Sequence, residues 1–130
     1  MGSQESEWGT QQCGRHTEII MKIPALPFTT TNWDTVSPTE HAGETGNARW
    51  RTQTFGDIRV RMVEYSAGYA ADHWCSKGHL ILCLEGSMET KLEDGRSFTL
   101  AAGESYHVGD DGDAPHRTST ITGAKLFIVD

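Results

Sequence analysis

The fold is decided by a stretch in which short apolar runs alternate with glycine-containing turns: HLILCLEGSMETKLEDGRSFTLAAGESYHVG, residues 79–109. The runs HLILCLE, SMETKLE, RSFTLA and SYHVG have the length of β-strands, and turns are expected at Glu85–Gly86, Asp94–Gly95 and Ala102–Gly103. Asp94–Gly95 suits a two-residue hairpin turn, which needs a positive φ. The pattern predicts an all-β sandwich or barrel.

Further strand-like segments lie on both sides of this stretch. They are NARWRTQTF (47–55), DIRVRMVEYS (57–66) and AKLFIVD (124–130), and no segment after residue 56 has the pattern of a long helix. An antiparallel barrel of about eight strands can enclose one small ligand. We therefore expect an antiparallel β-barrel with a small-molecule ligand.

Composition excludes several classes of partner. The chain has 130 residues, enough for one domain, and a net charge of −7 with scattered basic residues. No basic patch is present for a nucleic acid, and no apolar run is long enough to cross a membrane. The N-terminus lacks the pattern of a signal peptide, so we expect a cytoplasmic protein whose three cysteines are thiols.

The composition changes near residue 21, where a polar opening gives way to the apolar segment IIMKIPALPF. Residues 1–20 show no strand-like apolar pattern and are expected to form a flexible extension. The folded domain is expected to span residues 21–130.

The segment DHWCSKGH, residues 72–79, concentrates reactive side chains. In an extended strand, His73 and Cys75 would share one face, and His79 begins the next apolar run. Such a segment can hold a metal ion, activate a cysteine with a neighbouring histidine, or pack as an ordinary turn. The residues alone leave these three interpretations open.

The same segment resembles the first motif of the cupin superfamily, G-x5-H-x-H-x3,4-E-x6-G. Gly68, His73, Cys75, His79 and Gly86 occupy its positions. A cysteine stands in place of the second histidine, a histidine stands in place of the glutamate, and the first gap is one residue short.

The second cupin motif, G-x5-P-x-G-x2-H, resembles GESYHVGDDGDAPH, in which Gly103 and His116 match and the loop is longer. The stretch ADHWCSKGHLILCLEG is similar to the DHCW-motif cupin proteins, and the likeness spans about residues 21–130. The resemblance implies a single-domain jelly-roll β-barrel, often a homodimer, with one metal ion in the barrel mouth.

The metal prediction also has a chemical basis. His73, Cys75 and His79 can converge if the chain bends at Lys77–Gly78, and the second motif adds His116. Imidazole binds Zn, Fe and Ni well, and three histidines leave coordination positions open for water or substrate. One divalent transition metal ion is expected, with Zn, Fe, Mn and Ni as candidates. A Cys75 thiolate as fourth ligand favours Zn and a more closed site.

Three residues are candidates for substrate binding. Arg59 and Arg61 share a strand face and can hold a carboxylate if that face points inward, whereas on the outer face they are solvated. Tyr106 is the third candidate. Its neighbour His107 points to the opposite face, and the pattern does not say which of the two faces the barrel.

Three functional hypotheses follow. The favoured one is a metalloenzyme of oxygenase, isomerase or lyase type that acts on a small polar or anionic molecule. The second is a non-catalytic small-molecule binding protein. The third is a thiol-reactive protein that uses Cys75.

Overall fold

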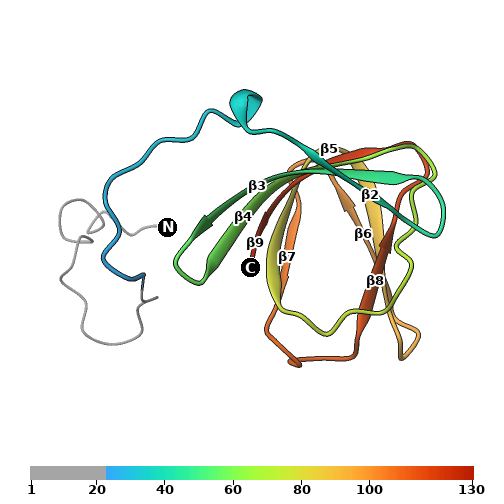
Figure 1. Ribbon diagram of the computed structural model, residues 1–130. Coiled ribbons are helices and arrows are strands. Elements are labelled where there is room, and N and C mark those ends of the chain that lie inside the picture. Colours follow the sequence, from blue (N-terminus) through green and yellow to red (C-terminus); the bar gives the residue numbers. More distant parts are fainter. Residues whose placement is uncertain (1–22) are drawn as a thin grey trace.

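The computed structural model describes residues 23–130, which form eight β-strands and one short 3-10 helix (Figure 1). In chain order the elements are η2 (Trp33–Thr35), β2 (Thr39–Ala42), β3 (Asn47–Phe55), β4 (Ile58–Tyr65), β5 (His79–Leu92), β6 (Ser97–Ala101), β7 (Ser105–Val108), β8 (His116–Ser119) and β9 (Ala124–Val129). The expected extension, residues 1–20, lies outside the described residues. Within residues 23–130, no helix is long and apolar enough to span a membrane.

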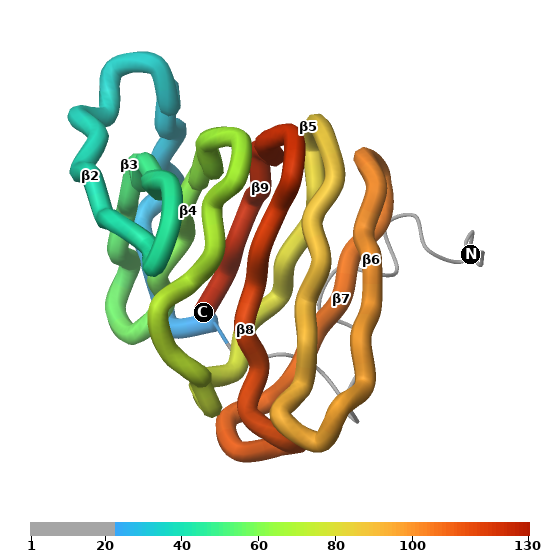
Figure 2. Tube along the Cα trace, turned by 90° about the vertical axis from the view of Figure 1, so that its right-hand side faces the viewer, coloured from blue at the N-terminus to red at the C-terminus, as the bar shows by residue number. Residues whose placement is uncertain are grey.

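The strands form two antiparallel sheets that share β5 (Figure 2). The first half of β5 lies between β9 and β7, in a sheet that continues through β4 and β3 to β2. Its second half lies between β6 and β8. The all-β, antiparallel prediction is therefore confirmed, and the barrel interior is the space between these two sheets.

The core fills this interior because inward positions alternate along each strand. In β9 the buried residues are Ala124, Leu126 and Ile128, and in β5 they include Ile81, Cys83 and Met88. Cys83 has no exposed surface and packs as an ordinary core thiol. The predicted segments 47–55, 57–66 and 124–130 correspond to β3, β4 and β9.

The predicted turn at Glu85–Gly86 is wrong, because the chain runs through this point as one 14-residue strand. The pairing of β5 with β9 shifts between Cys83 and Glu85, and Gly86 has a φ of +75°. A β-bulge followed by a left-handed glycine redirects a strand without ending it. The strand thereby passes from one sheet into the other.

The hairpin between β5 and β6 is confirmed, but its turn is longer than the two residues predicted. The N–H of Gly95 donates to the carbonyl of Leu92 at 2.9 Å, and the N–H of Leu92 donates to Arg96 at 2.8 Å. Gly95 has a φ of +103°, whereas Asp94 has no positive φ. The Asp94 carboxylate instead accepts hydrogen bonds from the backbone and guanidinium of Arg96, which stabilises the wider turn.

The outer face of the first half of β5 is apolar. Leu80, Leu82 and Leu84 alternate with the buried residues of that strand and are 53%, 36% and 37% exposed. The homodimer expected from the resemblance stays a prediction.

The Gly86→Ala substitution should destabilise the fold strongly. A Cβ atom there would lie 2.2 Å from the carbonyl oxygen of Gly123, and φ is also unfavourable for alanine. Gly103→Ala is the matched control, because Gly103 has a φ of +92° and open space around it. We expect Gly86→Ala to lower the free energy of unfolding by at least about 2 kcal/mol more than the control. Urea denaturation measures both, and equal losses would contradict the close contact.

Candidate functional site

A cavity of about 600 Å³ opens into the barrel between β6 and β7. β6 and β7 each pair with β5, and among the described strands they do not pair with each other. The cavity is lined by Thr90, Leu92, Arg96, Phe98, Thr99, Leu100, Glu104, Ser105, Tyr106, His107, Val108, Asp113, Ala114 and His116. Its volume is in the range of pockets that hold small molecules.

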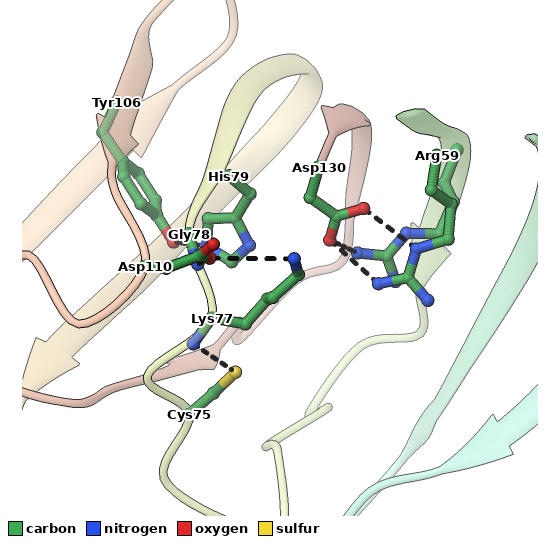
Figure 3. A network of polar contacts seen from close by, with 9 residues as sticks. Arg59, Cys75, Lys77, Gly78, His79, Tyr106, Asp110 and Asp130 are labelled. Carbon is green, nitrogen blue, oxygen red and sulfur yellow. Dashed lines mark hydrogen bonds and ion pairs between the residues drawn. The ribbon is translucent and has the colours of Figure 1, made fainter. Parts of the chain in front are cut away.

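Three rings meet at the inner end of this cavity, where Tyr106 and His116 belong to the lining and His79 does not. The imidazole Nε2 of His79 and the hydroxyl of Tyr106 are hydrogen-bonded at 3.0 Å. The ring centroids of His79 and His116 are 4.7 Å apart, and those of Tyr106 and His116 are 6.4 Å apart. Figure 3 shows His79 between Tyr106 on one side and Asp130 on the other. Of the pair left open by the sequence, Tyr106 faces the interior and His107 is exposed.

The backbone of His116 is hydrogen-bonded, but its buried ring nitrogen Nε2 is not. Its N–H and carbonyl each form a 2.9 Å hydrogen bond with the backbone of Cys75. The residue is 6% exposed, and its buried Nε2 has no hydrogen-bond partner. Burial lowers the pKa of His116, so the imidazole is neutral near pH 7.

His79 is also neutral. Burial, followed by the charge of His116, lowers the pKa of His79 to about 4. A neutral imidazole has one free lone pair, which can accept a proton or bind a metal ion. Burial raises the pKa of Tyr106, which keeps its hydroxyl protonated. The His79–Tyr106 pair therefore carries no charge near pH 7, and Tyr106 is the member of the pair that lines the cavity.

The structure brings together two of the four predicted metal ligands. The prediction that His73 and Cys75 share a strand face is wrong, since residues 71–78 form no regular strand and Cys75 makes an isolated bridge with His116. The imidazole of His73 is 74% exposed and contacts the Asp72 carboxylate at 2.7 Å. Within residues 23–130, no group of three or more His, Cys, Asp or Glu side chains is arranged to hold a metal ion.

Arg59 and Arg61 lie on the inner face of β4, so the solvated alternative is wrong for Arg61, which is 6% exposed. Both guanidiniums bind the Asp130 carboxylate, Arg59 through two hydrogen bonds of 2.9 and 2.8 Å and Arg61 through one of 3.0 Å. Arg61 also lies over the ring of Trp50, 4.3 Å from its centroid. Asp130 of the chain itself therefore lies between Arg59 and Arg61, where the carboxylate of a ligand was expected.

The role of Asp130 was missed in the sequence, although a signal was present. Ala124, Leu126, Ile128 and Asp130 occupy alternate positions and so share one face of the last strand. Burial raises the pKa of Asp130, but the hydrogen bond from Arg59 and the charges of both arginines outweigh it, and the pKa falls below its ordinary value. Asp130 is therefore ionised near neutral pH.

Asp130→Ala should destabilise the protein, because it leaves two guanidiniums at the barrel interior without a counterion. The Asp130 side chain is 1% exposed and that of Arg61 is 7% exposed. Removing one partner of a buried ion pair costs about 3 kcal/mol. Glu64→Ala is the control, because Glu64 forms a solvated 3.9 Å pair with Lys125, and its expected cost is below about 0.5 kcal/mol. Similar denaturation midpoints for the two variants would show that the Asp130 pair contributes little.

Comparison with known proteins identifies the fold. No protein-family model matches the sequence, and no curated protein matches it. Among solved structures, ectoine synthase from P. lautus is 14% identical, with a TM-score of 0.65 over 78% of this chain and 76% of that one.

Two further similar structures are described as cupins. A RmlC-like cupin from Shewanella frigidimarina NCIMB 400 is 17% identical, with a TM-score of 0.62 over 79% of this chain and 89% of that one. The Schizosaccharomyces pombe Cnp3 cupin domain is 13% identical, with a TM-score of 0.61 over 77% of this chain and 66% of that one. The narrower likeness to the DHCW-motif set stays a prediction. Identities this low establish architecture alone, and the architecture of this chain is the cupin-type jelly roll.

Proposed function

We propose that this protein binds a small molecule inside its barrel, in the cavity between β6 and β7. The observation that carries this proposal is a cavity of about 600 Å³ whose lining includes His116, a residue with a buried, unpartnered Nε2. A buried polar atom without a partner costs about 1–3 kcal/mol, and a ligand that pairs with it recovers part of that cost. The hydroxyls of Thr90 and Tyr106 are further polar groups in the lining.

A cavity-filling substitution tests this function. Ala114 is half-buried and lines the cavity, so Ala114→Trp places an indole in the space of a ligand. Ala102→Trp is the control, because Ala102 is exposed and outside the lining. Small molecules that shift the amide resonances of Leu100 and Val108 in the wild-type protein should lose at least about tenfold in affinity in Ala114→Trp alone. Unchanged affinity in both variants would place ligand binding elsewhere.

A second candidate function is metal-dependent catalysis on that small molecule. It is favoured by the two neutral imidazoles of His79 and His116, whose centroids are 4.7 Å apart. The fit is partial, because these two side chains converge while His73 is exposed. A divalent transition metal held by His79 and His116 would supply Lewis-acid chemistry at the inner end of the cavity.

Metal content tests this second candidate. We expect the purified protein to carry about one ion of Zn, Fe, Mn or Ni per chain, and His79→Ala to lower that content at least about fivefold. His41→Ala is the control, because His41 stacks on Trp50 outside the cavity lining. Elemental analysis of untagged protein gives the content. Less than about a tenth of an ion, without uptake of added metal, would exclude this candidate.

The role of Cys75 as a metal ligand stays a prediction. The sulfur of Cys75 accepts a 3.4 Å hydrogen bond from the backbone N–H of Lys77, and Cys75 is absent from the cavity lining (Figure 3). The thiol-reactive function stays a prediction from the sequence.

A further inference from the structure

We propose that the ligand of this cavity is an uncharged, largely apolar small molecule with one hydrogen-bonding group, which enters between β6 and β7 and places that group at Nε2 of His116. This inference rests on the proposed function and specifies its ligand class. It differs from the small polar or anionic molecule expected from the sequence. Four features of the cavity support it: the wall, the charges, the inner end and the opening.

The wall of the cavity is apolar. Leu92, Leu100 and Val108 contribute aliphatic surface, and Phe98 contributes an aromatic ring. Leu100 is 5% exposed whereas Phe98, two positions earlier on the same face of β6, is 51% exposed. The exposed phenylalanine therefore lies where the cavity opens, and an apolar ligand would cover it. Burial of apolar surface stabilises such a complex by about 25 cal/mol per Å².

The charges of the lining leave no position for an anion. Among the described residues of the lining, Arg96 is the one arginine or lysine. Its guanidinium is already bound by the carboxylates of Asp94 at 2.7 Å and Asp113 at 2.6 Å. Arg59 and Arg61 are outside the lining and share the Asp130 carboxylate. A carboxylate ligand would therefore lose its hydration without gaining a free cation.

The two carboxylates of the lining already accept hydrogen bonds within the protein. Asp113 is bound to Arg96, and the exposed Glu104 accepts the backbone N–H of Ala101 at 2.8 Å. A cationic ligand would have to compete with these contacts. An uncharged ligand fits this arrangement without disturbing any of these pairs.

The inner end has one buried side-chain polar atom without a partner among the described lining residues. The hydroxyls of Thr90 and Thr118 are 3.3 Å apart and partner each other, and the hydroxyl of Tyr106 is bonded to His79. Among the described lining residues, His116 is the one that has a buried side-chain polar atom, Nε2, without a partner. Nε2 of a neutral histidine donates or accepts according to its tautomer, and a ligand hydroxyl can satisfy either one. One such group on an apolar body is what the site can accommodate.

Three probes of similar shape test the ligand class on the full-length protein: p-cresol, p-toluate and toluene. Affinities come from shifts of the amide resonances of Phe98, Leu100 and Val108 in two-dimensional NMR titrations. We expect p-cresol to bind at least about fivefold more tightly than toluene and about tenfold more tightly than p-toluate. Equal or tighter binding of p-toluate would overturn the ligand class while leaving small-molecule binding intact.

The substitution His116→Phe tests the polar anchor. It keeps a ring at this position and removes Nε2, so p-cresol and toluene should bind within about twofold of each other. His41→Phe is the control, because His41 stacks on Trp50 outside the cavity. A preference for p-cresol that survives His116→Phe would overturn the assignment of the anchor.

A second variant keeps the test independent of the stability of the His116 variant. Phe98→Lys adds a cation at the opening, so the affinity for p-toluate should rise at least about fivefold while that for p-cresol does not rise. Ile121→Lys is the control, because Ile121 is 88% exposed and outside the lining. An unchanged p-toluate affinity in Phe98→Lys would show that missing positive charge does not exclude anions.

Two outcomes concern the proposed function itself. Failure of all three probes to shift the cavity amides at about 5 mM would overturn small-molecule binding in this cavity. Cavity resonances that instead shift with protein concentration would show that a second copy of the chain occupies the opening, and this would overturn both proposals.

Discussion

The architecture depends on one strand that belongs to two sheets. β5 pairs with β7 and β9 over its first half and with β6 and β8 over its second half. Gly86 allows this, because its left-handed φ and missing side chain let the chain pass within contact distance of Gly123. Any other residue at this point has to displace the backbone at Gly123, immediately before β9. The interior between the sheets exists because the strand bends there and continues.

The same bend sets the geometry of the site. His79 starts the first half of β5, whereas His116 belongs to β8, which pairs with the second half. Their rings lie close together because the two halves of β5 border the same interior. Tyr106 reaches them from β7, opposite Ile81. The polar cluster is therefore a product of sheet topology, and it forms although its members come from separate segments.

The period-two pattern was enough to predict that β3, β4 and β9 are strands. It did not give the inward face of β4, because the buried Arg61 points inward there while Ile58, Val60 and Met62 lie on the other face. It failed where a tertiary contact decides the backbone. The irregular course of residues 71–78 follows from the pairing of Cys75 with His116, which lies far along the chain. Similarly, the sequence showed that Arg59 and Arg61 share a face, but the carboxylate between them comes from the other end of the domain. Local pattern contains no information about such partners.

The absence of pairing between β6 and β7, among the described strands, affects how selective the cavity can be. The two strands that border the opening are each anchored to β5 and are free of hydrogen bonds to each other. The distance between them can change without the loss of any inter-strand hydrogen bond, so widening the entrance has a small enthalpic cost. If the proposed ligand binds here, homologous molecules of different length could enter, and discrimination among them would rest on the chemistry of the inner end.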